Sequence, residues 1–346
     1  MMHAPKKLSL FGAFLLLCNI QSYGYSFAII TEPLFGCFLI LSLFFLVKYI
    51  GNGKNTRDFF VFSLSLNYAL LIRPILMYFN MLVCLVLLIV FIVTKKQFRC
   101  FALFTLCFLF IFGGWSYRNY IHSGVFIFST VAKVNSQLHY APIITAGSQY
   151  AKTHDVTGII EGVTEYHEEM FLKDYPEVKD GNLNMAQIAV LQGEYGSRFI
   201  RAHLSEYIMC NITGFFKMMF TPFKQTDLFD RYSTLSAKSI IVNGAQLIYL
   251  VYIIIIYVLY LAGLAIGFKK HDDIQIGLFL LCGYLAVAGA IFGTARFRDP
   301  FFPLLLLSAI SNSGIIIQWL SQKLHNPILV RMEKYLLHET EADSND

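Results

Sequence analysis

Apolar runs long enough to cross a lipid bilayer are the feature that most limits how this chain can fold. A membrane-spanning helix needs about 20 mostly apolar residues, and runs near that length lie on both sides of a long polar stretch. Only 14% of the 346 residues are charged, whereas a soluble domain has about a quarter. The pattern predicts an all-α polytopic membrane protein with about eight transmembrane helices and one large, mostly helical extracytoplasmic domain. The runs that predict spans are Leu8–Ser22, Leu34–Ile50, Phe59–Ile72, Ile75–Val93, Cys100–Gly114, Ala245–Phe268, Ile274–Phe292 and Phe301–Leu320.

The boundary between the first membrane block and the polar stretch is predicted at Trp115–Ser129. There an apolar run gives way to an indole, an arginine, an asparagine and two tyrosines. Such side chains suit the lipid headgroup layer, because amphipathic rings settle there and a guanidinium can meet phosphate. The chain is divided accordingly into residues 1–114, an N-terminal membrane block of about five spans; 115–242, an extracytoplasmic domain with interfacial helices; 243–322, a C-terminal membrane block of about three spans; and 323–346, a cytoplasmic tail.

The positions of lysine and arginine predict the orientation of the spans. The short loops on one side hold only Arg73, Arg296 and Arg298. By the positive-inside rule, the side whose loops hold more lysine and arginine is cytoplasmic. Both termini are therefore cytoplasmic and the polar domain is extracytoplasmic. The net charge of +5 gives no indication of nucleic-acid binding. The basic residues of that cytoplasmic side are Lys6, Lys7, Lys48, Lys54, Arg57, Lys95, Lys96, Arg99, Lys269, Lys270, Lys323, Arg331 and Lys334.

Local patterns predict several further features. The N-terminal pair of lysines before an apolar run indicates a retained first span, with a cleaved signal peptide as the alternative. In the polar domain, Asn182 or Asn184 can cap a helix over Met185–His203. The run Gly214–Phe223 predicts a short helix lying in the membrane interface. Five histidines of this domain show no metal-ligand spacing: His122, His139, His154, His167 and His203.

Charged residues predicted at the extracytoplasmic face are candidates for a binding site, because ionisable groups at membrane depth are costly. Glu32 precedes Pro33 at the start of a span, and the arginines lie at other outer turns or beside the polar domain. One acid and several arginines suit a phosphate-linked lipid, with a divalent metal cation on the acid. The alternatives are that an arginine at a helix end, such as Arg73, only reaches the headgroups, and that Glu32 only complements a helix dipole. For Arg296 and Arg298, the alternative is that they pair with Asp299 or anchor the helix end.

Four short motifs occur in an order that resembles a known family. They are ITEPLF at 30–35, LLIRP at 70–74, W-x-x-R-N-Y-x-x-x-G at 115–124 and ARFRDPFFP at 295–303. This order is similar to the later part of GT-C glycosyltransferases that use polyprenyl-phosphate sugars, the group containing protein O-mannosyltransferases and lipid A aminoarabinose transferases. The segment Arg198–Phe220 also resembles the long helix that these proteins carry before their later spans.

The resemblance implies a GT-C-like fold and a role for each matching position. It implies that the donor phosphate is bound by Arg73, Arg118, Arg296 and Arg298. It places Trp115, Asn119 and Tyr120 close to the substrate, and it puts Glu32 near a metal or the donor phosphate. The implied ligands are a polyprenyl-phosphate-linked sugar and membrane lipids, and the implied location is a bacterial inner membrane. The topology alone equally suits an endoplasmic reticulum membrane. No residue is assigned as the catalytic base.

The family's first spans and the acidic loop that supplies its catalytic base have no counterpart here. The loop Gln21–Thr31, which follows the first predicted span, contains no aspartate or glutamate. The expectation is therefore a truncated or split glycosyltransferase, whose missing N-terminal segment a partner subunit would supply. The alternative is a non-catalytic membrane protein that binds lipid-phosphate or scaffolds an envelope assembly. A transporter is disfavoured, because no matching pair of Gly/Pro-broken spans occurs in two halves.

Overall fold

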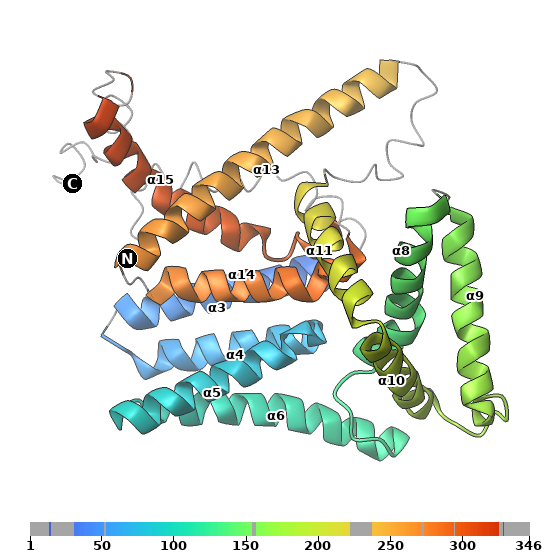
Figure 1. Ribbon diagram of the computed structural model, residues 1–346. Coiled ribbons are helices and arrows are strands. Elements are labelled where there is room, and N and C mark those ends of the chain that lie inside the picture. The colour runs from blue at the N-terminus through green and yellow to red at the C-terminus, as the bar shows by residue number, and fades with distance from the viewer. Residues whose placement is uncertain are drawn as a thin grey trace. The chain divides into compact units, whose positions relative to one another are not determined.

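The computed structural model describes residues 31–51, 53–153, 157–221, 237–270, 273–293 and 295–324, together with residues 14 and 328. Within these ranges the protein is all-helical and contains no strand (Figure 1). Apart from residue 14 and Thr31, the predicted first span Leu8–Ser22 and the loop Gln21–Thr31 lie outside the described residues, as does most of the predicted cytoplasmic tail. The all-helical fold class predicted from the sequence is confirmed for the described part of the chain.

The helices form two compact units. One unit comprises residues 1–69, 217–286 and 294–346, and the other comprises residues 70–216 and 287–293. These units are defined by packing, so the division into membrane blocks and an extracytoplasmic domain stays a prediction. The α-helices are α3 Thr31–Gly51, α4 Thr56–Ile72, α5 Met77–Thr94, α6 Phe98–Ser123, α7 Val131–Asn135, α8 Ala141–Thr153, α9 Thr157–Asp174, α10 Met185–Ala202, α11 Leu204–Phe220, α13 Ala237–Lys270, α14 Asp273–Gly289 and α15 Phe302–Leu324.

Four helical segments in the described ranges are long and apolar enough to cross a membrane. They are Thr31–Gly51, Pro74–Thr94, Phe98–Ser123 and Ile274–Phe292. Each coincides with a span predicted from the sequence, and together they indicate an integral membrane protein. The predicted span Phe59–Ile72 lies in α4, a helix of 17 residues. The predicted span Ala245–Phe268 lies within the 34 residues of α13.

In the first unit, α3 and α4 form a helical hairpin at whose turn aromatic and charged groups meet. Tyr49 and Phe59 pack with ring centroids 5.0 Å apart, and Lys48 pairs with the buried Asp58 at 3.2 Å. Elsewhere in this unit, α13 packs along α15 (Figure 1). The hydroxyl of Ser308 on α15 donates to Gln275 on α14 at 2.6 Å. Two buried polar side chains thus satisfy each other, which avoids the cost of unpaired polar groups.

In the second unit, α5 and α6 form a hairpin, and α8, α9 and α10 pack around a shared core (Figure 1). That core contains Ala141, Phe171 and Tyr195. Helix α10 lies so close to the π-helical turn η2 (Ser136–Tyr140) that a Cβ on Gly196 would collide with Ser136. Glycine at this position therefore permits the contact, since any larger residue would push the helices apart.

The start of α10 confirms the predicted cap. Asn184 accepts hydrogen bonds from the backbone N–H groups of Ala186 and Gln187, both at 3.1 Å. The side chain of Gln187 in turn accepts from the backbone N–H of Asn184 at 2.9 Å. This reciprocal arrangement satisfies two donors that the helix start would otherwise leave open. The sequence predicted either Asn182 or Asn184 as the cap, and the structure shows that it is Asn184.

Two helix boundaries differ from those predicted. The predicted boundary at Trp115–Ser129 is in large part helical, because α6 continues to Ser123 and ends only at Gly124, whose φ is 71°. A change in polarity does not stop a helix, whereas a glycine in the left-handed region does. The long helix implied for Arg198–Phe220 is instead broken at His203, whose φ is −126° and ψ is 46°. The chain therefore turns between α10 and α11.

Candidate functional site

The structure brings together two of the predicted site residues, Glu32 and Arg296, which are 264 positions apart in the chain. Nε of Arg296 donates to Oε1 of Glu32 at 2.5 Å. The side chain of Glu32 is fully buried, whereas that of Arg296 is 49% exposed. A buried carboxylate therefore holds a guanidinium whose outer part stays accessible. This is a charge-assisted contact of the strong kind.

Local sequence explains how this pair is positioned. Glu32 lies in the first turn of α3, where the helix dipole favours an acidic side chain. Phe35, Leu39 and Leu43 follow at helical spacing on the same buried face. One turn after Glu32, a Cβ on Gly36 would lie 3.4 Å from the carbonyl oxygen of Pro300. The face of α3 that carries Glu32 thus packs directly on the loop that carries Arg296.

Arg298, predicted to bind donor phosphate, lies in a different environment. It is 1% exposed, and its Nη1 donates to the carbonyl oxygens of Met218, Met219 and Thr221 at 3.2, 2.7 and 3.1 Å. These carbonyls belong to the C-terminal end of α11, where backbone acceptors have no partner within the helix. Arg298 therefore caps a helix end, and its positive charge complements the dipole there. Contact with a phosphate would require this cap to open.

Aromatic rings of α13 complete the surroundings of Arg298. Its guanidinium carbon lies 6.0 Å from the ring centroid of Tyr249. The hydroxyl of Tyr257 donates to the carbonyl of Met219 at 2.9 Å, which is one of the carbonyls that Arg298 also binds. The arginine and the tyrosine together fix the end of α11 against α13. This is a buried polar network whose members satisfy each other.

In the second unit, the predicted substrate-proximal residues lie on the last turns of α6. The guanidinium of Arg118 lies 4.7 Å from the ring centroid of Trp115, and its Nη1 donates to Oδ1 of Asn119 at 3.1 Å. Nδ2 of Asn119 donates to the carbonyls of Ile127 and Phe128 at 2.8 and 3.2 Å. Asn119 thus ties the following loop to the helix, while Trp115 and Tyr120 stay 43% and 50% exposed.

Arg73 lies just before α5, the other helix of the hairpin that α6 forms. Its backbone is extended (φ −137°, ψ 111°) before Pro74, as the residue before proline prefers. Cys84 and Thr105 contact each other across the hairpin, and Phe91 packs on Phe98. Because α5 and α6 run antiparallel, Arg73 lies before the start of α5, at the end of the hairpin toward which the last turns of α6 run. The hairpin therefore brings Arg73 and Arg118 to the same end.

The sequence predicts a divalent cation at Glu32. Among the described residues, no group of three or more histidine, cysteine, aspartate or glutamate side chains is placed to hold a metal ion. The acid proposed for it, Glu32, is engaged by Arg296. A divalent cation on Glu32 therefore stays a prediction.

A buried polar cluster in the second unit was missed from the sequence. His167 is fully buried; its Nε2 lies 2.9 Å from the hydroxyl of Thr145 and its Nδ1 lies 2.8 Å from that of Tyr195. Burial and, secondarily, the proximity of His203 lower the pKa of His167. The available signal was Tyr195 itself, a hydroxyl on the apolar face of α10, because buried tyrosines need a hydrogen-bond partner. The cluster joins α8, α9 and α10.

Comparison with known protein families, curated proteins and solved structures finds no match to this chain.

Proposed function

We propose that this protein binds a polyprenyl-phosphate-linked sugar at the extracytoplasmic face of a bacterial inner membrane and takes part in transferring the sugar to a lipid, polysaccharide or protein acceptor. It would act as a GT-C-type glycosyltransferase with about eight spans, or as one subunit of such an enzyme. The observation that supports this is the contact between Glu32 and Arg296. Two residues that the resemblance assigns to one donor site meet in space although their motifs lie at opposite ends of the chain.

The exposed arginine of this pair suits an anionic ligand. Since Glu32 fixes Nε of Arg296, the terminal nitrogens of the guanidinium are oriented and about half of the side chain is accessible. Guanidinium groups bind phosphate oxygens through paired N–H donors. Arg118, exposed over Trp115, is a second arginine of this kind. Arg298 supports the site indirectly, because its bonds hold the end of α11.

In the transfer, an acceptor oxygen forms a bond to the anomeric carbon of the sugar, and the bond from that carbon to the phosphate oxygen breaks. The electron pair leaves with the polyprenyl phosphate, whose growing negative charge an arginine stabilises. The proton of the acceptor hydroxyl passes to a base, which we assign to a partner subunit. Glu32 holds Arg296 and is not itself that base.

The test compares binding of a polyprenyl phosphate with binding of the polyprenol of equal length, using the full chain in lipid nanodiscs. Wild type should bind the phosphate more tightly than the polyprenol. In Arg296→Gln the ratio of the two affinities should be about tenfold smaller, since one charge-assisted contact is removed. Arg57→Gln is the matched control, because Arg57 is an exposed arginine at the start of α4. Equal phosphate preference in all three proteins would rule out the assignment of Arg296.

A second candidate function is binding of lipid-phosphate without catalysis. It is favoured by the same ion pair, because an acid engaged by an arginine holds that arginine rather than accepting a proton. Sugar transfer measured in membranes separates the two functions. Turnover by this chain, alone or with its partner, that falls about a hundredfold in Arg296→Gln would establish catalysis. Phosphate-dependent binding without turnover would establish the non-catalytic function.

A further inference from the structure

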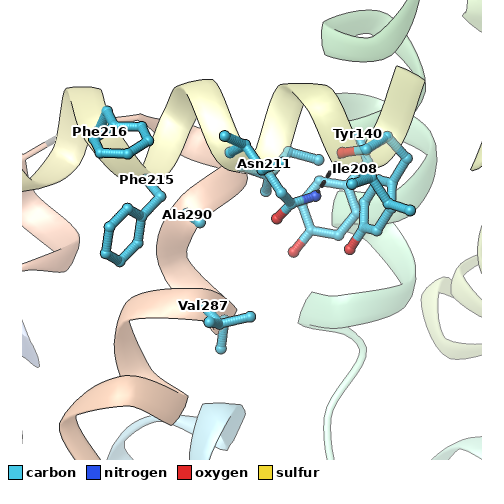
Figure 2. A pocket seen from close by; sticks show the side chains of 11 residues that line it. Tyr140, Ile208, Asn211, Phe215, Phe216, Val287 and Ala290 are labelled. Atoms are coloured by element: carbon cyan, nitrogen blue, oxygen red, sulfur yellow. Dashed lines mark hydrogen bonds between the residues drawn. The ribbon is translucent and has the colours of Figure 1, made fainter. Parts of the chain in front are cut away.

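An open groove in the second unit is lined by none of the candidate site residues described above. It has a volume of about 520 Å³ and runs between α11 and the end of α14 with the short helix η4 (Ala290–Phe292). Tyr140 and Asn211 lie toward one end, and Phe215 and Phe216 toward the other (Figure 2). Val287 and Ile291 form the opposite wall. The groove thus has a hydrogen-bonding end and an apolar end.

The two walls of the groove are fixed by a close backbone contact. A Cβ placed on Gly214 of α11 would collide with the carbonyl oxygen of Ala290. The helix α11 and the segment η4 therefore meet at backbone distance, next to Phe215 and Ile291, which line the groove. Such a contact holds the walls at a set separation, because neither side has a flexible side chain that could yield.

The π-helical turn η2 positions the polar end. Tyr140 is the last residue of this turn, and its ring packs on Phe292 with centroids 5.5 Å apart. Single π-helical turns within α-helices frequently lie at functional sites. Burial, with a smaller effect of Tyr207, raises the pKa of Tyr140 to about 12. Its hydroxyl therefore remains a neutral hydrogen-bond donor. Asn211 donates Nδ2 to the carbonyl of Tyr207 at 2.9 Å, which directs the amide group along the wall.

The charge of the lining determines which ligand suits the groove. All of its lining residues are apolar, aromatic or uncharged polar, and no lysine, arginine, aspartate or glutamate is among them. A phosphate or carboxylate placed there would lose hydration without gaining a countercharge. A hydroxylated headgroup would instead find Tyr140, Tyr207 and Asn211 as partners.

The position of the groove indicates where the ligand comes from. Its wall at Val287–Ile291 is the end of the candidate membrane span Ile274–Phe292. Val287 itself is 66% exposed. A groove at the end of a membrane span opens at the depth where lipid headgroups meet acyl chains. The molecules present there in high concentration are membrane lipids, not water-soluble metabolites.

We propose that this groove binds an uncharged amphiphile from the membrane, with its hydrocarbon chain along Phe215, Val287 and Ile291 and its hydroxylated headgroup at Tyr140 and Asn211. The site differs in chemistry from the arginine sites, which suit a phosphate. It rests on the groove alone and does not depend on the proposed sugar transfer.

The experiment uses the full chain in lipid nanodiscs and a monoacylglycerol that carries a photoactivatable diazirine in its acyl chain. Labelling should map to peptides of α11 and of the end of α14. Unlabelled monooleoylglycerol should compete, and lysophosphatidate with the same acyl chain should compete at least about tenfold less well, because its charge finds no partner. Equal or better competition by lysophosphatidate would overturn the assignment of an uncharged ligand.

Two substitutions on one helix provide the matched pair. Val287→Trp fills the groove and should reduce labelling about tenfold. Leu280→Trp introduces the same side chain two turns earlier on α14, at a residue that is 54% exposed, and should leave labelling unchanged. Equal labelling in the two variants would exclude the groove as the site.

A third substitution tests the headgroup contact independently of packing. Wild type should bind monooleoylglycerol about fivefold better than methyl oleate, which lacks the hydroxyls, and Asn211→Leu should abolish that preference. Arg296→Gln should leave monoacylglycerol labelling unchanged, so failure of the proposed phosphate site and failure of this inference are distinguishable. A monoacylglycerol preference that persists in Asn211→Leu would contradict the headgroup placement.

Discussion

Arg296 and Arg298 are separated by a single residue, yet they lie in opposite environments. Arg296 is half exposed and is held by one buried carboxylate. Arg298 is 1% exposed and donates to backbone carbonyls at the end of α11. The guanidinium of Arg296 is accessible from solvent, whereas that of Arg298 is part of the fold. A motif that contains both arginines therefore does not give them a common role.

The difference arises because the two guanidinium groups lose different amounts of hydration when the protein folds. Buried charge is costly, so Arg298 is stable only because several acceptors compensate for lost water. Arg296 keeps contact with solvent and needs only one partner to be oriented. The comparison predicts that substitutions at Arg298 change stability first, and that substitutions at Arg296 change binding first.

Among the predicted substitutions, Arg298→Ala should lower the stability of the folded protein most. Removing the guanidinium leaves the carbonyls of Met218, Met219 and Thr221 without a shared donor, at a cost of about 3–5 kcal/mol. Thermal unfolding in detergent, followed by near-UV circular dichroism, measures the loss. Arg298→Lys should restore part of it, because an ammonium still donates to one or two carbonyls. If Arg298→Ala and Arg296→Ala unfold at the same temperature, the contrast between the two arginines is wrong.

The next effect concerns the acid that holds Arg296. Glu32→Ala leaves a cavity in the buried face of α3 and should cost about 2–3 kcal/mol. Glu32→Gln keeps the shape of the side chain and should cost less. A double-mutant cycle between Glu32→Gln and Arg296→Gln, measured by thermal unfolding, should give a coupling energy of about 1 kcal/mol. Simple additivity of the two substitutions would show that the pair does not act as a unit.

The buried His167 can be compared with the two arginines, because burial favours its neutral form. The pKa of His167 is lowered in the folded protein by burial and by His203, so the folded state binds a proton less readily than the unfolded state. The stability that neutral His167 contributes to the folded state is fully present above the unfolded pKa of about 6.5. It is lost as the pH falls through and below that value.

The measurement for His167 is thermal stability between pH 7.5 and pH 5. Wild type should lose stability as the pH falls, and His167→Gln should lose less, since glutamine does not titrate. Tyr195→Phe removes the hydrogen bond to Nδ1 and should cost about 1 kcal/mol at pH 7.5. An identical pH profile in wild type and His167→Gln would refute the role of this histidine.

The smallest effect on stability is expected for Arg118→Ala. This arginine lies over Trp115 on an exposed turn, where such a contact contributes about 0.5–1 kcal/mol. Preference for polyprenyl phosphate over polyprenol should nevertheless fall, as for Arg296→Gln. Trp115→Phe keeps an aromatic surface under the guanidinium and is the milder control. A loss of stability as large as that of Arg298→Ala would place Arg118 with the structural arginines.

Local signals in the sequence were read correctly in several places. Of the two predicted caps, Asn182 and Asn184, the structure has Asn184, and the reciprocal bond of Gln187 was not predicted. The apolar runs at Leu34–Ile50 and Ile75–Val93 became α3 and the segment Pro74–Thr94, because length and polarity suffice to identify them. At Trp115 the polarity changes, but no residue there ends the helix, so α6 continues beyond the predicted span Cys100–Gly114.

What the sequence determined by itself is the class of protein: a helical chain with apolar segments of membrane-spanning length, bounded by caps and glycines that act over a few residues. What only the tertiary structure decided is the role of each charged side chain. The partners of Arg298 lie 77 to 80 positions earlier, and the partner of Arg296 lies 264 positions earlier. Hydrogen bonding and burial depend on which atoms meet in space, and no local pattern records that for residues so far apart.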